Sequence, residues 1–286
     1  MRRSSILALL TLAVPGYAQA PQPAEAGGHL VNVGDHRIYM KCSGPATHPT
    51  VVLETGAGAT TTSYEQVQER VQRFARVCSY DRAGLGSSDP SPSKQTENDV
   101  LQDLHRALLA SKEPGPYVLV GESLGGVYVR AFQTRYPALV KGLVLVDSSH
   151  EEQLNRFSAV SPELGKAYAA QGGRTTFEDM YGLWGQLRPG QTYTWKVTLP
   201  LIVIEHKRSS PVADPNASRP NAAQPNIDPV WHEMQVDLAR RSTCGQIWEA
   251  TKEGHAISEV QPDLVVQAIS TVLQEIASGC ERPSPR

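Results

Sequence analysis

The chain has 286 residues, of which 27 are lysine or arginine and 29 are aspartate or glutamate, so its formal net charge is −2. This near-neutral balance argues against a nucleic-acid-binding protein, which needs clustered basic residues to displace counterions from phosphates. Scattered glycine and proline, together with 40% hydrophobic residues, exclude collagen-like, coiled-coil and disordered chains. The length fits one large globular domain or two small ones.

Residues 1–20 are expected to be a secretory signal peptide that is removed from the mature protein. Arg2 and Arg3 form a basic start, residues 6–14 are apolar apart from Thr11, and Ala18-Gln19-Ala20 offers small residues for cleavage. The apolar run is shorter than the roughly 20 residues that span a bilayer, so we expect no membrane span after cleavage. Loss of the two arginines changes the net charge from −2 to −4. The mature chain is therefore expected to be periplasmic or secreted.

The cysteines are interpreted in the light of this expected export. None of the four forms a C-x-x-C pair, so we expect no zinc or other metal site. An even number of cysteines in an oxidising compartment predicts disulfides, and four cysteines allow three pairings. We favour Cys42–Cys78, in early strand-like runs, and Cys244–Cys280, near the C-terminus.

From Leu30 onward, apolar runs that favour strands alternate with stretches of helical periodicity. The expected strands are Ile38–Cys42, Thr50–Glu54, Arg76–Tyr80, Tyr117–Gly121, Gly142–Asp147, Leu201–Glu205 and Gln246–Ala250. The expected helices are Tyr64–Phe74, Asn98–Ala110, Gly125–Tyr136 and Pro262–Ala277. Several strands are nearly continuous valine, leucine and isoleucine runs, typical of central parallel strands covered on both faces. The alternation predicts a single doubly wound α/β domain over residues 21–286.

Two segments interrupt this alternation. Residues 148–198 form an insertion between two strands, and its large apolar residues predict a small helical cap. These residues are Phe157, Tyr168, Phe177, Met180, Tyr181 and Trp184. Residues 206–228 are rich in proline, asparagine, serine and alanine without periodicity, which predicts a long irregular loop. Residues 281–286 are expected to be a frayed tail.

The most informative motif is Gly121-Glu122-Ser123-Leu124-Gly125-Gly126, between an expected strand and an expected helix. In that context Gly-x-Ser-x-Gly is typical of a nucleophilic serine on a sharp turn, because the flanking glycines leave room for the turn. The N-terminus of the following helix favours a developing anion. The alternative is a glycine-rich turn that merely contains a serine. We favour Ser123 as the nucleophile.

A serine hydroxyl needs a general base, and His255 is the strongest candidate among eight histidines. It lies in a loop between the last expected strand and the final helix, at the carboxyl end of the expected sheet. We expect His206 and His232 to be surface residues, His105 to lie on a helix and His150 to start the cap.

Three carboxylates are candidates for the acid that orients the base. Asp147 ends an expected strand and lies between Ser123 and His255 in chain order. Asp214 lies in the irregular loop after the next strand, and Glu205 ends that strand. We favour Asp147 and leave the other two open.

Two turns follow other strands. Thr55-Gly56-Ala57-Gly58 is an unobstructed turn, and we expect the N–H groups of Ala57 and Leu124 to form an oxyanion hole, although small residues are also ordinary turn material. Residues 81–86 lack the lysine of a phosphate-binding P-loop and the spacing of a dinucleotide fingerprint, so we expect a structural turn. Arginines at positions 70, 73 and 76 predict a solvated helix face.

Together, the order Ser123…Asp147…His255, the turn after Glu54 and residues 80–86 and 121–126 resemble the α/β-hydrolase superfamily over residues 30–277. The resemblance implies a mostly parallel eight-stranded sheet flanked by helices, with a cap over the pocket. It also implies a cofactor-free esterase, lipase or amidase that works through an acyl-enzyme. Thr55 and Glu122 depart from it, since many members have histidine at both positions. Haloalkane dehalogenases share the fold but use an aspartate nucleophile, so Ser123 argues against that activity.

We therefore expect a serine hydrolase that cleaves carboxylic esters of small to medium-sized molecules, with a small-molecule ester substrate as its partner. The nearest alternative is an amidase, lactonase or peptidase with the same catalytic residues. A non-catalytic binding protein on the same fold is an alternative of a different class.

Overall fold

The computed structural model of the chain describes residues 27–47, 49–166, 198–207 and 226–280. The expected signal peptide, the candidate acid Asp214, residues 167–197 of the expected cap and the tail 281–286 lie outside these ranges. Within them, no helix combines the length and the apolar character needed to cross a membrane.

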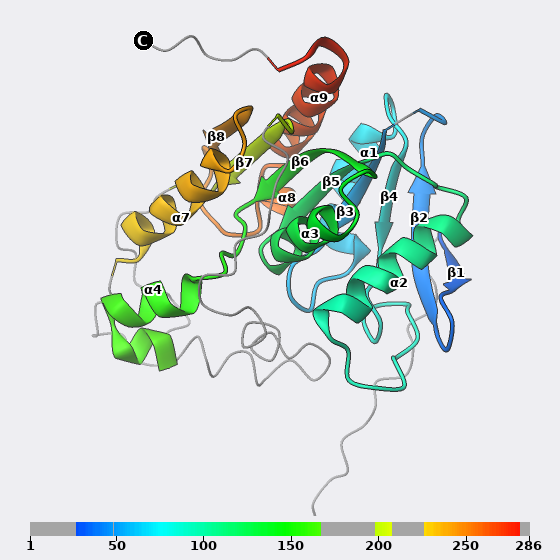
Figure 1. Ribbon diagram of the computed structural model, residues 1–286, viewed down its shortest axis with the longest axis horizontal. Coiled ribbons are helices and arrows are strands. Elements are labelled where there is room, and N and C mark those ends of the chain that lie inside the picture. The colour runs from blue at the N-terminus through cyan, green and yellow to red at the C-terminus, as the bar shows by residue number, and fades with distance from the viewer. Residues whose placement is uncertain (1–26, 48, 167–197, 208–225, 281–286) are drawn as a thin grey trace, which may run out of the picture.

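An eight-stranded sheet forms the centre of the fold (Figure 1). Its strands are β1 His29–Asn32, β2 Arg37–Ser43, β3 Thr50–Glu54, β4 Val77–Tyr80, β5 Tyr117–Glu122, β6 Val140–Val146, β7 Leu201–Glu205 and β8 Gly245–Glu249. Their spatial order is β1-β2-β4-β3-β5-β6-β7-β8. The β1–β2 and β2–β4 pairs are antiparallel and all the others are parallel. The predicted mostly parallel sheet is thus confirmed.

Every strand that the sequence predicts is present, and β1 is an addition. This edge strand has four residues and pairs with β2 alone. Its polar ends, His29 and Asn32, leave too short an apolar pattern for recognition in the sequence. The central strands β3 to β7 are almost entirely buried, which explains their continuous aliphatic runs.

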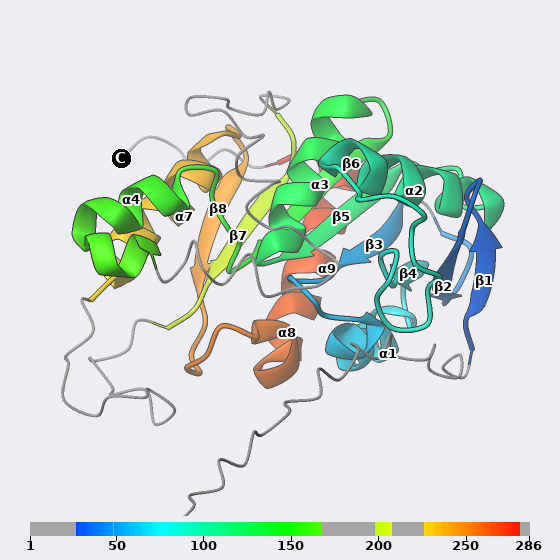
Figure 2. The ribbon, with the colours of Figure 1, turned by 90° about the horizontal axis from the view of Figure 1, so that it is seen from below.

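Helices cover both faces of the sheet (Figure 2). The helices on one face are α2 Glu97–Ala110, α3 Leu124–Arg135 and α7 Asp228–Arg240. Those on the other face are α1 Glu65–Val71, α8 Ile257–Val260 and α9 Pro262–Ser278, with the short 3-10 helix η1 Thr61–Tyr64. Each face buries its own apolar cluster against the sheet. The α4 helix, Gln153–Val160, begins the expected cap and packs against α7.

The α7 helix was not predicted from the sequence. Its first residue, Asp228, is the last residue of the proline- and asparagine-rich stretch that indicates an irregular loop. Yet Trp231, Met234 and Leu238 are buried at the spacing of one helix face. The proline at the first turn suits a helix start as well as a loop, so the composition of the preceding stretch hid the periodicity.

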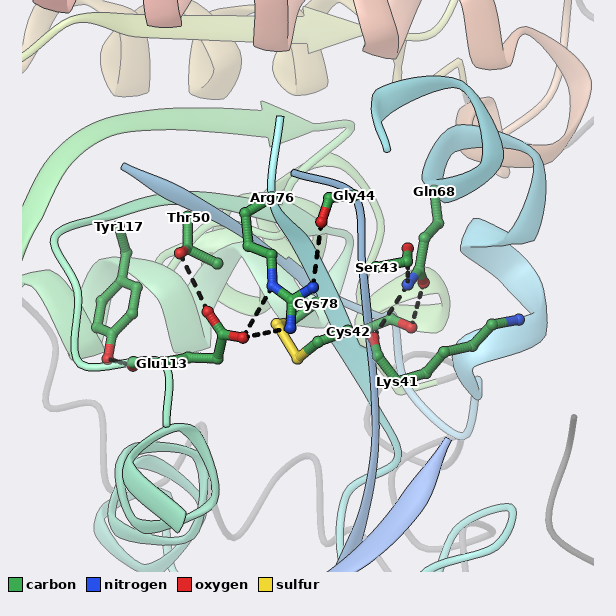
Figure 3. Close-up of a disulfide and its surroundings, with 11 residues drawn as sticks. Lys41, Cys42, Ser43, Gly44, Thr50, Gln68, Arg76, Cys78, Glu113 and Tyr117 are labelled. Carbon is green, nitrogen blue, oxygen red and sulfur yellow. Dashed lines mark hydrogen bonds and ion pairs between the residues drawn. A yellow bond between two sulfur atoms is a disulfide. The ribbon is translucent and has the colours of Figure 1, made fainter. Parts of the chain in front are cut away.

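Both predicted disulfides are present. Cys42–Cys78 joins directly opposed residues of β2 and β4 (Figure 3). Beside it, Arg76 pairs with the buried Glu113 at 2.6 Å, so this arginine does not lie on the expected solvated helix face. Glu113 and the two sulfurs are the one group of potential metal ligands among the described residues, and the sulfurs are bonded to each other.

The second disulfide, Cys244–Cys280, connects the residue before β8 to a residue just after α9. It closes a segment that contains β8, the loop with His255, and the last two helices. The candidate base is therefore carried by a stretch of chain that is held at both ends.

Candidate active site

Ser123 lies on the sharp turn between β5 and α3, with φ 53° and ψ −120°. This left-handed backbone is unfavourable for a residue with a side chain, by about 1–3 kcal/mol, and persists only where its surroundings enforce it. The Ser123 N–H donates to the carbonyl of Val146 at 3.0 Å. The Ser123 carbonyl accepts from the N–H groups of Gly126 at 3.1 Å and Ser149 at 2.9 Å. The turn is thus fixed against the end of β6.

The two flanking glycines are required by close backbone approach. A β-carbon at Gly125 would lie 2.3 Å from the carbonyl oxygen of Glu54, and one at Gly121 would lie 2.5 Å from the carbonyl oxygen of Gly125. Both neighbours are main-chain atoms, which cannot move aside without displacing β3 or the turn. The Gly-x-Ser-x-Gly pattern therefore has a direct steric cause in this chain.

The structure places Asp147 against His255. Asp147 follows β6 directly, has φ 43° and is fully buried. Its Oδ2 lies 2.5 Å from Nδ1 of His255, which is in the loop after β8. The His255 side chain is 55% exposed, so the side of the ring away from Asp147 is open. The contact leaves Nε2 of His255 available to exchange a proton with another group.

The loop of His255 is anchored beside the nucleophile by Glu122. The N–H and the hydroxyl of Ser258 donate to the buried Glu122 carboxylate at 3.1 and 2.6 Å. Burial raises the pKa of Glu122, against the hydrogen bonds from Ser258. No hydrogen bond joins Ser123 Oγ to His255 in the described part of the chain, and such bonds are often long before a substrate binds.

Besides the candidate base His255, two other residues donate hydrogen bonds to Asp147. Trp231 Nε1 donates to Oδ1 at 2.7 Å, and His206 contributes both its N–H, at 3.1 Å, and its Nδ1, at 2.9 Å from each oxygen. Burial alone would raise the pKa of Asp147, but the hydrogen bonds from His206 and His255 hold it at about 2. Burial would lower the pKa of His255, but the hydrogen bond and charge of Asp147 raise it. An ionised carboxylate thus strengthens the basicity of His255.

Of the other two candidate acids, the structure describes only Glu205, and it contacts a different histidine. Glu205 is buried and accepts from Nδ1 of His232 at 2.9 and 2.8 Å, one for each oxygen. Asp214 lies outside the described residues. The expectation that His206 and His232 are surface residues is wrong, since each orders its ring against a buried carboxylate. For His206, its position directly after β7 was the signal that could have placed it there, whereas His232 lies on α7, a helix that was not predicted.

The turn Thr55–Gly58 lies next to the serine. A β-carbon at Gly56 would lie 3.4 Å from Cβ and 3.9 Å from Oγ of Ser123. In the described ranges, neither the Ala57 N–H nor the Leu124 N–H has a hydrogen-bond partner. Two unpaired donors therefore flank the serine, from the two loops in which the sequence expects them.

Arg82 lies in the expected structural turn after β4, and its hydrogen bonds fix the turn Thr55–Gly58. Its guanidinium is buried and donates to the Glu54 carboxylate at 2.5 Å, to the Thr55 carbonyl at 2.8 Å and to the Gly56 carbonyl at 2.5 Å. Asp81 shapes the same turn by accepting from the N–H groups of Thr61 and Ser87. The turn is structural as expected, but its arginine also reaches the site, which the sequence did not reveal.

Comparison with known proteins agrees with the fold. Residues 49–183 match the family model described as alpha/beta hydrolase fold. A probable transporter, efuK of Hormonema carpetanum, is 28% identical over 141 residues, which cover 47% of this chain and 20% of that protein. The matched stretch likewise covers 30% and 25% of the next two curated relatives, so all three are far longer than the shared region.

Two solved structures have nearly the same extent as this chain. A putative lipase from Acinetobacter baumannii superposes with a TM-score of 0.63 at 18% identity, covering 88% of this chain and 92% of that one. A thermophilic esterase from Thermogutta terrifontis superposes with a TM-score of 0.61 at 20% identity, covering 88% and 99%. At this identity the likeness establishes the common fold.

Proposed function

The chain belongs to the α/β-hydrolase superfamily, and we propose that it is a serine hydrolase that cleaves carboxylic esters of small to medium-sized molecules. The observation that carries this proposal is the 2.5 Å contact between Asp147 Oδ2 and His255 Nδ1, beside a serine in a left-handed turn. Nucleophile, base and orienting acid are then all available on neighbouring strand ends.

In the proposed first half-reaction, Nε2 of His255 takes the hydroxyl proton of Ser123 as Oγ attacks the ester carbonyl. The N–H groups of Ala57 and Leu124 bind the negative oxygen of the tetrahedral intermediate, and the Asp147 carboxylate balances the imidazolium. The intermediate collapses, and His255 gives its proton to the departing alcohol. Ser123 then carries the acyl group as an ester.

In the second half-reaction water replaces the alcohol. Nε2 of His255 takes a proton from water, whose oxygen attacks the acyl carbonyl and forms a second tetrahedral intermediate. The acid product leaves as the Ser123 hydroxyl regains its proton. These steps consume one ester and one water and need no cofactor.

The protonation state of His255 gives the proposed reaction a defined pH dependence. The base must be neutral to take a proton, and Asp147 raises its pKa above the ordinary value of 6.5, against the effect of burial. We therefore expect kcat/KM to fall as the pH drops through neutrality, with an apparent pKa above 6.5. The fall should begin at a higher pH than for an isolated imidazole.

Labelling with a fluorophosphonate probe tests the nucleophile directly. Ser123 should react in the folded wild type, and Ser123→Ala should abolish both labelling and hydrolysis of a 4-nitrophenyl ester. Paired ester, anilide and lactone substrates that share one acyl group separate the proposed ester hydrolysis from amidase and lactonase activity. Wild-type protein that is neither labelled nor active would support a non-catalytic binding protein instead.

Export is the second part of the proposal. Two disulfides are compatible with an oxidising compartment and uncommon in the reducing cytosol. Mass spectrometry of the protein recovered from the periplasm or medium of its host should find a chain that begins at position 21. Recovery of uncleaved protein from the cytosol would contradict export.

A further inference from the structure

The carboxylate of Asp147 contacts two histidines, and the proposed reaction uses only one of them. His255 comes from the loop after β8, whereas His206 directly follows β7. Strands β6, β7 and β8 are neighbours, so their carboxyl ends lie side by side (Figure 1). Both Nδ1 atoms contact the same oxygen, Oδ2, at 2.5 Å for His255 and 2.9 Å for His206.

We propose that His206 is a positioning residue, which holds the Asp147 carboxylate toward His255 and whose positive charge keeps His255 neutral at lower pH. This inference rests on the proposed function, because it assigns His255 the role of general base.

Asp147 is fixed by contacts with β7, His206 and α7. Its N–H donates to the Ile204 carbonyl at 2.6 Å, so the β6–β7 pairing sets its backbone. The His206 N–H and Trp231 Nε1 donate to Oδ1, and the His206 ring bridges Oδ1 and Oδ2. Two of these donors contact Oδ1 alone, so Oδ2 is left for the rings of His255 and His206. An ionised carboxylate only accepts, so Nδ1 of His206 carries a hydrogen.

Three carboxylates surround His206. Burial lowers its pKa, but Asp147, Asp228 and Glu205 together raise it. Asp147 comes from the end of β6 and Glu205 from the end of β7, while Asp228, at the start of α7, lies 3.8 Å from Nε2. The His206 side chain is 20% exposed, so the solvent screens the charge of its ring only in part.

The charge of His206 opposes the protonation of His255. Two imidazolium rings on one carboxylate repel each other, and this repulsion lowers the pKa of His255, whereas Asp147 and Glu122 raise it. As long as His206 is protonated, His255 keeps its lone pair to a lower pH than Asp147 alone would allow. The two histidines therefore titrate as a coupled pair.

His206→Asn separates the positioning of Asp147 from the effect of charge on His255, because an amide nitrogen can replace Nδ1 as a donor but cannot become charged. We expect the acidic limb of the kcat/KM profile to move upward by about 0.5–1 pH unit, with kcat on the alkaline plateau kept within about threefold. His206→Ala loses the donor as well, so plateau kcat should also fall, by about tenfold or more.

His232→Asn is the matched control. His232 holds Glu205 by the same two-oxygen contact through Nδ1, at 2.9 and 2.8 Å, yet does not contact Asp147. Its profile should keep the wild-type acidic limb. The proposal would be overturned if the acidic limb of the His206→Asn profile stayed in place or moved to lower pH. It would also be overturned if His232→Asn shifted its acidic limb by the same amount.

A second measurement does not depend on hydrolysis. In Ser123→Ala protein, NMR titration of the imidazole signals gives the pKa of His255 directly, with and without His206→Asn. We expect the added substitution to raise this pKa, and an unchanged or lower value would refute the charge effect. If the wild type proves inactive, the proposed function fails while this titration still decides the coupling between the two histidines.

Discussion

Replacement of Arg82 by lysine tests whether Arg82 fixes the turn Thr55–Gly58, which carries the proposed oxyanion donor Ala57 N–H. The guanidinium donates to the carbonyls of Thr55 and Gly56 at 2.8 and 2.5 Å and pairs with Glu54 at 2.5 Å. In a trans peptide the N–H points opposite to the preceding carbonyl. When Arg82 holds the Gly56 carbonyl, it therefore also fixes the direction of the Ala57 N–H.

The size of the effect follows from the proposed role of that N–H. Loss of one oxyanion donor costs about 100- to 1000-fold in kcat, which is about 2.7–4 kcal/mol. Lysine keeps a charge beside Glu54 but lacks the planar fork that reaches carboxylate and carbonyl together. The Leu124 N–H is unaffected, so we expect Arg82→Lys to lower kcat by about 10- to 100-fold and to change KM by less than about threefold.

Lysine is preferred to alanine, because removal of one member of a buried ion pair costs about 3–5 kcal/mol and could unfold the protein. Steady-state hydrolysis of a 4-nitrophenyl ester gives kcat and KM, and affinity for a trifluoromethyl ketone should fall in parallel with kcat/KM. Arg37→Lys is the matched control, since Arg37 pairs with Asp89 through two bonds but is 53% exposed and begins β2, which β4 and β3 separate from β5 and Ser123. An unchanged kcat in a folded Arg82→Lys protein would refute the reasoning.

Three further outcomes follow from the structure. Asp147→Asn should lower kcat by about 1000- to 10,000-fold, because the amide no longer balances an imidazolium, whereas Glu205→Gln should retain most activity; the reverse ranking would identify Glu205 as the acid. Gly125→Ala should destabilise the fold by about 1–3 kcal/mol and abolish fluorophosphonate labelling, since its β-carbon would lie 2.3 Å from the carbonyl at the end of β3; normal labelling would contradict that clash. Double replacement of Cys244 and Cys280 by serine should lower the free energy of unfolding by about 4 kcal/mol, from loop entropy over a separation of 36 residues, and urea denaturation that matches the parent would show no such effect.

The sheet could be predicted from the sequence because local rules decide it. Buried parallel strands need apolar residues on both faces, and β5, β6 and β7 each contain four consecutive apolar residues. The turn at Ser123 could be predicted for a similar reason, since close main-chain contacts at Gly121 and Gly125 admit only glycine. In both cases the constraint leaves a recognisable pattern in a few consecutive residues, even though the carbonyl that excludes a side chain at Gly125 belongs to Glu54.

Contacts between distant segments left no such pattern. Arg82 reaches the turn after β3 because β4 and β3 are neighbours in the sheet, although 26 residues separate it from Gly56. His206 contacts Asp147 across 59 residues, and Trp231 does so across 84. A lone histidine or arginine beside a polar stretch is most often solvated, so composition favoured the wrong interpretation for His206.

The choice of acid shows where chain order ceases to discriminate. Asp147 and Glu205 both lie at the carboxyl ends of adjacent parallel strands, and the pairing of Val146 with Ile204 brings those ends to nearly the same level. Each carboxylate is buried and each holds a histidine through Nδ1. They differ in backbone and in contacts: Asp147 follows β6 with φ 43° and contacts His255, whereas Glu205 is the last residue of β7 and contacts His232. Because both candidates are carboxylates at neighbouring strand ends, only the tertiary contact with His255 favours Asp147, and a positive φ at a residue with a side chain is set by its surroundings rather than by a local sequence pattern.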